Sequence, residues 1–286
     1  MAWSLTGSPE EYLAIAGGFL RSDPVRNTIA LTAAETVRVR GLRTFGEVEP
    51  LFGWWRSGDG EITAALLHTP PYPILLTGLP EGSARPLAEA LIARRRQVRG
   101  VNAEEGIGAA FAAVWAGLTG AGAEEFLRSR LYWLGRLRPP EPPSGGAARL
   151  ASEADRDLLR AWLAAFSEEI ADGIVIDRDE TIDDRLSYGG LTIWESGGAP
   201  VSLAGIHRPA AGTVRVGPVY TPPEHRRLGY GGAATAAVSR AALDSGASNV
   251  VLFTDQANPA SNSLYQRLGF DPVEERVVLH FLSQRS

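Results

Sequence analysis

The chain has 286 residues, of which 44% are hydrophobic and 21% are charged, and its formal net charge is -5. This composition is typical of a globular protein of one large or two ordinary domains, and the acidic balance argues against a general nucleic-acid binder, which usually has a basic face. The sequence has no cysteine, no apolar run near the ~18 residues of a membrane helix and no signal-like N-terminus, so we expect a cytoplasmic protein without disulfides, thiolate ligands or membrane contact.

A hairpin in the first half of the chain is repeated in the second half. Trp55 and His68 are thirteen residues apart, as are Trp194 and His207, and a Ser-Gly pair follows each tryptophan after one residue. Each segment is predicted to form a strand, a turn and a second strand. A further strand follows in each copy, at 74–77 and 214–219, and then a helix. We interpret the two halves as a tandem duplication.

A proline- and glycine-rich stretch lies between the two copies. Four prolines fall between Arg138 and Gly146, where they stiffen the backbone and prevent regular strand pairing. We therefore predict an N-terminal domain over 1–138, a linker over 139–146 and a C-terminal domain over 147–286.

The second half is predicted to alternate strands and helices, in the order of an α/β protein with a mixed (α+β) sheet. The expected strands are 149–151, 191–194, 201–207, 214–219, 249–254 and 273–281, and the expected helices are 155–166, 233–244 and 261–268. The first of these helices carries Leu158, Leu159, Trp162 and Phe166 along one face. We expect an acidic loop after it, over 168–184.

The most informative stretch is Glu-His-Arg-Arg-Leu-Gly-Tyr-Gly-Gly at 224–232, which follows a strand-like run and opens a helical one. Glycines let backbone N–H groups turn toward one point, and a helix N-terminus adds partial positive charge there, so this layout suits a phosphate group. The spacing matches neither G-x-x-x-x-G-K-[ST] nor G-x-G-x-x-G.

It does match R-x-x-G-x-G, through Arg226, Gly229 and Gly231, and this is similar to the acyl-CoA diphosphate loop of the GCN5-related N-acetyltransferases (GNATs). A second segment, from Asn258 through Tyr265 to Gly269-Phe270, resembles the N-x-x-[AS]-x-x-L-Y-x-x-x-G-F motif of that family. The resemblance covers the chain from about residue 150 onward. With the repeat, it implies two tandem GNAT-like domains, each a twisted mixed sheet flanked by helices. The first would be a degenerate copy, because 78–86 lacks the loop motif.

The resemblance implies acetyl-CoA as the acyl donor and no metal. Main-chain amides of the glycine-rich turn would face the diphosphate, and the end of the preceding strand would run along the pantetheine arm. The residues expected to bind acetyl-CoA are Val219, Tyr220, Thr221, Arg226, Arg227, Leu228, Gly229, Tyr230, Gly231, Gly232, Asn258, Ser261 and Tyr265.

The catalytic roles also come from the resemblance. The N–H of Val219 would stabilise the oxyanion, and Tyr265 would protonate the departing thiolate, although packing against Phe270 also explains this tyrosine. Glu168 and Glu169 are the candidates for the general base and Glu195 is a third, but a solvated carboxylate explains each as well. We expect His207 to be structural, because the copy without a cofactor loop keeps the equivalent His68.

The implied function is transfer of an acetyl group to a primary amine by direct attack in a ternary complex, because no cysteine is present to carry an acyl intermediate. The acceptor would be a small-molecule or peptide amine. The carboxylates of 168–184 would attract a cationic amine if they line the cleft, but a solvated acidic loop explains them equally. The alternative is a non-catalytic acyl-CoA sensor or scaffold. We expect no nucleic-acid or membrane partner, and either a monomer whose halves form a pseudo-dimer or a homodimer.

Overall fold

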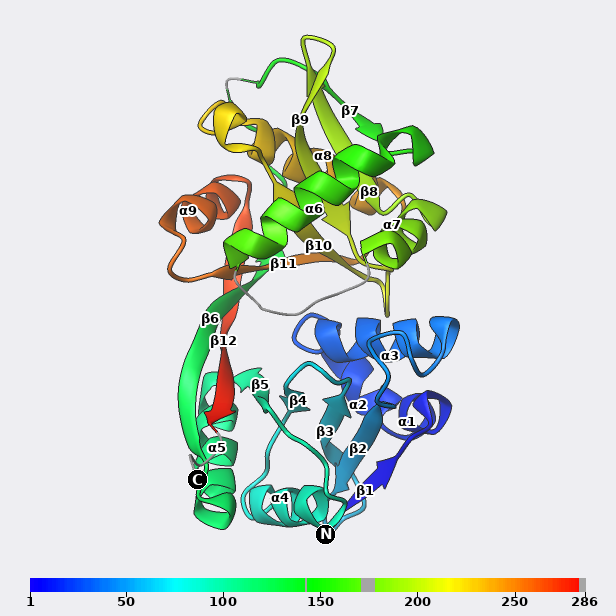
Figure 1. Cartoon of the computed structure of the whole chain (residues 1–286), viewed down its shortest axis with the longest axis vertical. Helices are drawn as coiled ribbons and strands as arrows, with labels where there is room; N and C mark the ends of the chain where they lie inside the picture. Colours follow the sequence, from blue (N-terminus) through cyan, green and yellow to red (C-terminus); the bar gives the residue numbers. More distant parts are fainter. Residues whose placement is uncertain (142, 171–177, 283–286) are drawn as a thin grey trace. The chain divides into compact units, whose positions relative to one another are not determined.

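The computed structural model describes residues 1–141, 143–170 and 178–282 (Figure 1). Its contacts divide the chain into two compact units. Unit 1 contains Met1–Arg130, Asp255–Ala257 and Glu274–Ser286, and unit 2 contains Leu131–Thr254 and Asn258–Val273. Two strands, β6 (Gly122–Leu134) and β12 (Phe270–Leu282), contribute residues to both units. The predicted boundaries at 138 and 147 stay a prediction, because a division by contacts does not test independent folding.

Unit 1 is a mixed sheet with the strand order β1-β2-β3-β4-β5-β12-β6, in which β4 and β5 run parallel. Helices α4 and α5 pack on it through Leu87, Leu91 and Phe111, which are fully buried. Its elements are β1 (Ala2–Thr6), α1 (Pro9–Ile15), α2 (Gly17–Ser22), α3 (Thr28–Arg40), β2 (Leu51–Arg56), β3 (Ile62–His68), β4 (Ile74–Thr77), α4 (Ala84–Ala93), β5 (Gly100–Glu104) and α5 (Glu105–Thr119). The second half of β12 pairs antiparallel with β5, with Arg276 opposite Glu104.

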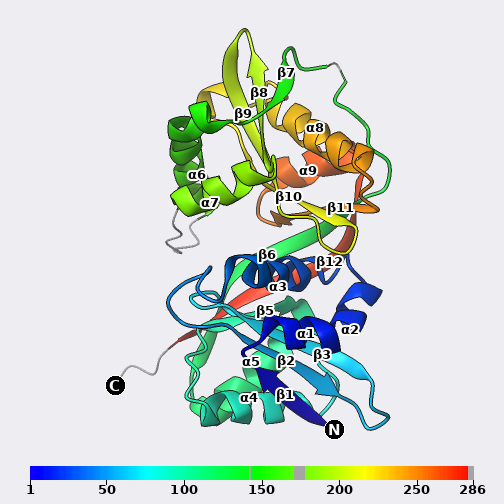
Figure 2. The ribbon, with the colours of Figure 1, turned by 90° about the vertical axis from the view of Figure 1, so that its right-hand side faces the viewer.

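Unit 2 is a second mixed sheet, with the strand order β12-β6-β11-β10-β9-β8-β7 and β10 parallel to β11. Its other elements are β7 (Ala147–Leu150), η1 (Glu153–Asp155), α6 (Arg156–Ile170), α7 (Arg178–Ser187), β8 (Leu191–Ser196), β9 (Ala199–Ile206), β10 (Thr213–Tyr220), η2 (Pro223–His225), α8 (Tyr230–Asp244), β11 (Asn249–Asp255) and α9 (Pro259–Arg267). Helices α6 and α7 cover one face of this sheet, and α8 and α9 cover the other (Figure 2). Each face therefore has its own apolar core.

The two predicted hairpins are present in the two units. Trp55 lies opposite Ala64 in the β2–β3 pair, and Trp194 lies opposite Ser202 in the β8–β9 pair. In each unit a third antiparallel strand follows, β4 or β10, and a helix then leads to a parallel strand, β5 or β11. The repeated sequence pattern thus corresponds to a repeated order of strands.

The prediction of a loop over 168–184 is wrong at both ends, because residues 168–170 belong to α6 and residues 178–184 belong to α7. Residues 171–177 lie outside the described residues. Ile182 is fully buried, and Leu186 packs against the same core. Residues four apart share a helix face, so these two anchor α7. The prediction missed this short apolar stripe because carboxylates dominate the segment, although acidic residues in a first turn are favoured by the helix dipole.

Arg149 joins β7 to the beginning of α6. Its guanidinium donates two hydrogen bonds to Asp155, at 2.7 and 2.8 Å, and one to Glu195 at 2.7 Å. Asp155 also accepts the N–H of Ser152 at 2.8 Å, in a capping box. The hydrogen bonds from Arg149 lower the pKa of Asp155 to about 2, from an ordinary value of 3.8.

Replacing Asp155 with Asn should therefore lower the free energy of unfolding by about 1 kcal/mol at neutral pH. The folded-state pKa is depressed, so the contribution of the carboxylate is present above about pH 4 and is lost as the pH falls through about 2. Urea unfolding of both proteins at pH 7, 4 and 2.5 would measure it.

The matched control is Asp157→Asn, because the Asp157 side chain is 97% exposed although it also pairs with an arginine. It should change stability little at any pH. A cost of Asp155→Asn that stays the same at pH 2.5 would contradict the assigned role of the carboxylate.

Candidate active site

The glycine-rich turn of unit 2 ends at the N-terminus of α8. Gly229 is the N-cap residue and has a φ of +83°, which is the left-handed region that glycine adopts without strain. Since glycine has no side chain, no side-chain hydrogen bond occupies the cap. The start of α8 therefore has no side-chain cap, and helix N-termini of this kind can bind phosphate through their first N–H groups.

Two further glycines allow the turn to pack tightly. A Cβ on Gly231 would lie 3.1 Å from Oγ1 of Thr221, at the end of β10, and a Cβ on Gly232 would lie 2.9 Å from Cδ1 of Leu264 on α9. Small residues at these positions bring the start of α8 against both β10 and α9. The glycine spacing that the sequence shows thus reflects one left-handed residue and two close approaches.

Arg226 ties this turn to α6. Its Nε donates to the main-chain oxygen of Thr221 at 2.9 Å, and its Nη2 pairs with Oε1 of Glu169. The structure thereby brings together a predicted cofactor residue and a predicted general-base candidate, in an ion pair at the surface. Glu168, the other candidate, is exposed at the end of α6. Glu195 lies on β8, separated from β10 by β9, and pairs with Arg149.

The end of β10 carries the pantetheine-arm residues predicted from the resemblance. Its pairing with β9 shifts register between Val216 and Val219, so that Gly217 and Pro218 form a bulge. Proline has no N–H to donate there. Beyond the bulge, Val219 and Tyr220 pair with β9 again, and Oγ of Ser202 lies 3.0 Å from the main-chain oxygen of Tyr220. The strand therefore leaves regular pairing just before the predicted oxyanion donor.

The second motif forms α9. The side chain of Asn258 accepts the N–H of Ser261 at 3.0 Å and caps the helix, so this spacing has a local structural role. Tyr265 is 8% exposed, and its ring packs edge-on against Phe270 at 6.1 Å. Burial raises the pKa of Tyr265 to about 12, so that the phenol stays protonated near neutral pH and can donate a hydrogen bond.

Each unit pairs its repeated histidine with an arginine. Nδ1 of His207 lies 3.1 Å from Nη2 of Arg215, and Nε of Arg96 donates to Nδ1 of His68 at 3.0 Å. Burial and the nearby cations hold the pKa of His207 well below its usual range, and lower that of His68 to about 3. A guanidinium only donates, so each Nδ1 accepts and each ring is neutral. The pairing supports a structural role for both.

The carboxylates of α7 are largely paired with arginines. Asp179 lies 2.6 Å from Nε of Arg160, Asp183 pairs with Arg156, and Asp184 lies 2.7 Å from Nη2 of Arg208. The arginines of these pairs reduce the negative electrostatic potential that the carboxylates of α7 produce around the helix. They favour the interpretation of this stretch as a charged surface element over an attractive funnel for cations.

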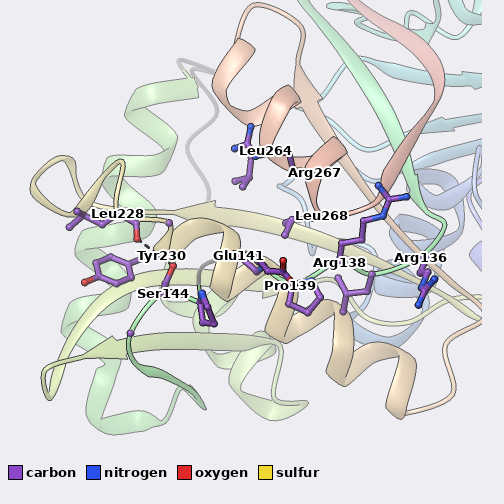
Figure 3. Close-up of a pocket in the computed structure, with 15 residues that line it drawn as sticks. Arg136, Arg138, Pro139, Glu141, Ser144, Leu228, Tyr230, Leu264, Arg267 and Leu268 are labelled. Carbon is purple, nitrogen blue, oxygen red and sulfur yellow. Dashed lines mark hydrogen bonds between the residues drawn. The ribbon is translucent and has the colours of Figure 1, made fainter.

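A cavity of about 1130 Å³ opens beside the glycine-rich turn (Figure 3). It is bounded by residues 136–141 and 143–145, the turn and helix α9. Its lining combines cations with apolar groups: Arg136, Leu137, Arg138, Pro139, Pro140, Glu141, Pro143, Ser144, Gly145, Leu228, Gly229, Tyr230, Leu264, Arg267 and Leu268. The prediction of a linker over 139–146 does not include this lining, and in the sequence only Arg136 and Arg138, before the prolines, indicate a further role.

Among the residues that the structure describes, no histidine and carboxylate cluster has the arrangement of a metal site. Over the same residues, no helix is long and apolar enough to cross a membrane. The cytoplasmic location stays a prediction.

Comparison with known families decides what this site belongs to. Residues 151–270 match the sequence model of the acetyltransferase (GNAT) family. This match identifies residues 151–270 as a GNAT acetyltransferase domain. GNAT proteins transfer acyl groups from acyl-CoA to amine acceptors, and the matched residues include the glycine-rich turn and the segment from Asn258 to Phe270. No curated protein matches the chain significantly.

Solved structures similar to the chain extend the likeness to its whole length. A Drosophila protein aligns over 99% of both chains, with a TM-score of 0.69 and 14% identity. A GCN5-related N-acetyltransferase from Sphaerobacter thermophilus aligns over 99% of this chain and 96% of its own, with a TM-score of 0.61 and 16% identity. A tandem GNAT protein from the clavulanic acid biosynthesis pathway aligns over 98% of both chains, with a TM-score of 0.56 and 17% identity. The predicted tandem GNAT-like fold is confirmed.

Proposed function

We propose that unit 2 transfers an acetyl group from acetyl-CoA to a primary amine, by direct attack in a ternary complex. The observation that carries this proposal is the glycine-capped start of α8 at residues 229–230, which lies about a dozen residues after the β10 bulge at 217–218. One short stretch of chain, 217–232, would thereby supply both a diphosphate site and an oxyanion donor. Acyl transfer to an amine needs both, together with an acid for the thiolate.

The diphosphate would accept hydrogen bonds from the amides of 227–232. Arg226 supports this site indirectly, because its guanidinium holds Thr221 and Glu169 and so fixes the turn. Gly231 and Gly232 leave no room for side chains that would displace the turn from β10 and α9. The geometry of the turn thus fits the donor substrate that the family uses.

The cavity beside the turn would take the nucleotide end of CoA. Arg136 and Arg138 are exposed, and together with Arg267 they give the cavity a positive balance in a chain of net charge -5. Phosphate groups pair well with guanidinium groups, and prolines and leucines offer apolar surface to a base.

At the reacting end, the N–H of Val219 would stabilise the oxyanion as the amine attacks the thioester carbon. The C–S bond then breaks, and the phenol of Tyr265 would give its proton to the departing sulfur. The raised pKa of Tyr265 keeps that proton in place near neutral pH. Glu168 or Glu169, directly or through water, would accept the proton that the amine loses.

Gly231→Asp should abolish binding of acetyl-CoA. The new carboxylate would repel the diphosphate, and its Cβ would crowd Thr221. For the parent protein, acetyl-CoA at about 100 times its Kd should raise the Tm by roughly 5–10 °C in a thermal-shift titration, and the variant should lose most of this shift.

Gly117→Asp on α5 is the matched control, because nothing lies within 4 Å of a Cβ at this position and it belongs to unit 1. It should keep the shift. A well-folded parent protein without any shift would rule out the acetyltransferase proposal.

Tyr265→Phe should lower kcat by about a hundredfold and leave the Kd for CoA nearly unchanged, because only the proton donor is lost. The measurement is release of free CoA with a panel of primary amines, together with calorimetric titration of CoA. A parent protein that binds CoA tightly but turns over with none of the amines would instead favour a sensor.

The double variant Arg136→Glu/Arg138→Glu should raise the Kd for CoA by about tenfold, because it reverses two charges in the cavity. The Kd for pantetheine, which lacks the nucleotide, should not change. Arg240→Glu, at an exposed position late in α8, is the control and should leave both constants unchanged. An equal loss for CoA and pantetheine would contradict the assignment of the cavity.

A further inference from the structure

The bulge on β10 leaves main-chain groups that the sheet does not pair. Val216 lies opposite Ile206, but the next paired residue is Val219, opposite Ala204. β10 therefore has one residue more than β9 over this interval, and the carbonyl of Gly217 lies within it. A half-buried carbonyl that leaves the ladder needs another donor, because an unsatisfied one costs about 1–3 kcal/mol.

Arg185, in the last turn of α7, supplies that donor. Its Nη1 lies 2.8 Å from the oxygen of Gly217 and 3.2 Å from the oxygen of Ile206. One nitrogen thus spans β9 and β10 at the point where their register breaks. The hydroxyl of Tyr188 donates to the same oxygen of Ile206 at 3.0 Å.

The backbone around Arg185 is tied to the same strands. Its main-chain oxygen accepts the N–H of Gly190 at 2.7 Å, and the oxygen of Gly190 accepts the N–H of Ile206 at 2.8 Å. The end of α7 is therefore fixed against the end of β9. The side chain of Arg185 is only 9% exposed, and a buried guanidinium is tolerated where its N–H groups are satisfied.

A glycine on β9 makes room for this contact. A Cβ on Gly205 would lie 2.7 Å from Nη1 of Arg185, 3.0 Å from the oxygen of Gly217 and 3.1 Å from Cδ of Pro218. Any larger residue would push the guanidinium away from the bulge. The arginine, the glycine and the bulge therefore form one packed arrangement.

We propose that Arg185 is a positioning residue, which holds the β10 bulge in the geometry that points the N–H of Val219 at the thioester oxygen. The guanidinium fixes Gly217, two residues before Val219, and so restricts the main chain that carries the donor. The catalytic part of this inference rests on the proposed function, because Val219 has its role only there. The structural part, that Arg185 fixes the bulge, does not.

Three variants test it. Arg185→Met keeps a flexible, unbranched side chain but removes its donors. Arg185→Lys keeps one donor and should restore part of the lost behaviour. Gly205→Ala disturbs the contact from β9 and leaves the arginine in the chain, so that a failure of Arg185→Met to fold does not end the test.

The matched control is Arg208→Met. Arg208 belongs to the same cluster, where it pairs with Asp184 at 2.7 Å and lies 4.4 Å from the centre of the Tyr188 ring. The Arg208→Met variant removes a guanidinium from this cluster but keeps the Arg185 donor to the oxygen of Gly217. Loss of stability alone should affect this variant as well.

The first measurement is amide hydrogen exchange, followed by mass spectrometry, in the protein without ligand. Exchange over 216–221 should speed up at least tenfold in Arg185→Met and Gly205→Ala, relative to β11, and should not change in Arg208→Met. Unchanged exchange over 216–221 in folded Arg185→Met would overturn the inference, whether or not the protein is an acetyltransferase.

The second measurement is turnover with an amine that the parent protein acetylates. In Arg185→Met, kcat should fall by about a hundredfold, as expected for a misplaced oxyanion donor, while the Kd for CoA stays within about threefold. Arg185→Lys should recover part of kcat. A fall in CoA affinity equal to the fall in kcat, or an equal loss in Arg208→Met, would overturn the positioning role. If amide exchange is faster in the variants but the parent protein acetylates no amine, the proposed function is overturned. Arg185 then remains a structural support of the bulge.

Discussion

The pairing of β10 with β9 goes out of register at Gly217 and Pro218, and the arrangement of the site depends on this break. A main-chain donor on a strand can reach a ligand only where the sheet does not pair it, and the pairing of β10 with β11 extends only from Thr213 to Val216. The break has to be supported from elsewhere, and the guanidinium of Arg185 bridges the two strands there. The same strand then leads within ten residues to the N-terminus of α8. In the proposed function, a strand amide and a helix terminus on one short stretch of chain would contact the two ends of one extended ligand.

The first unit shows what the same strand order looks like without this break. β4 is four residues long and pairs with β3 in continuous register, from Ala65 opposite Thr77 to Leu67 opposite Leu75. The segment that follows contains Pro80 and Pro86, which lack the amides that a phosphate would need. Both units keep a neutral histidine that accepts from an arginine. The features shared by the two units therefore belong to the hairpin, whereas the features found in only one belong to the candidate active site.

Most elements of unit 2 could be predicted from the sequence, because its strands are apolar runs and its helices follow strong glycine and proline signals. The glycine-rich turn was predicted for the same reason, since a left-handed residue and two close approaches leave a recognisable spacing. Arg185 could not be found in this way. It is one arginine in an acidic run, and its importance comes from a carbonyl on β10 that is far from it in the sequence. The ion pair of Arg226 with Glu169 and the lining of the cavity by residues 136–141 and 143–145 also depend on tertiary contacts, and no local sequence pattern predicts them. The pairing of β12 with β5 was missed as well, because strand partners are chosen by the whole fold.

The pairing of β12 with β5 has a consequence for the folding of the chain during its synthesis on the ribosome. The sheet of unit 1 needs a strand around Arg276 to cover β5, which ends at Glu104. At about 5–20 residues per second, synthesis of the intervening chain takes on the order of ten to thirty seconds. During that time β5 has an open edge, and edges of this kind attract other chains. The nascent first half would thus depend on chaperones, or on its acidic and arginine-rich surface, to remain unpaired until its last strand is made.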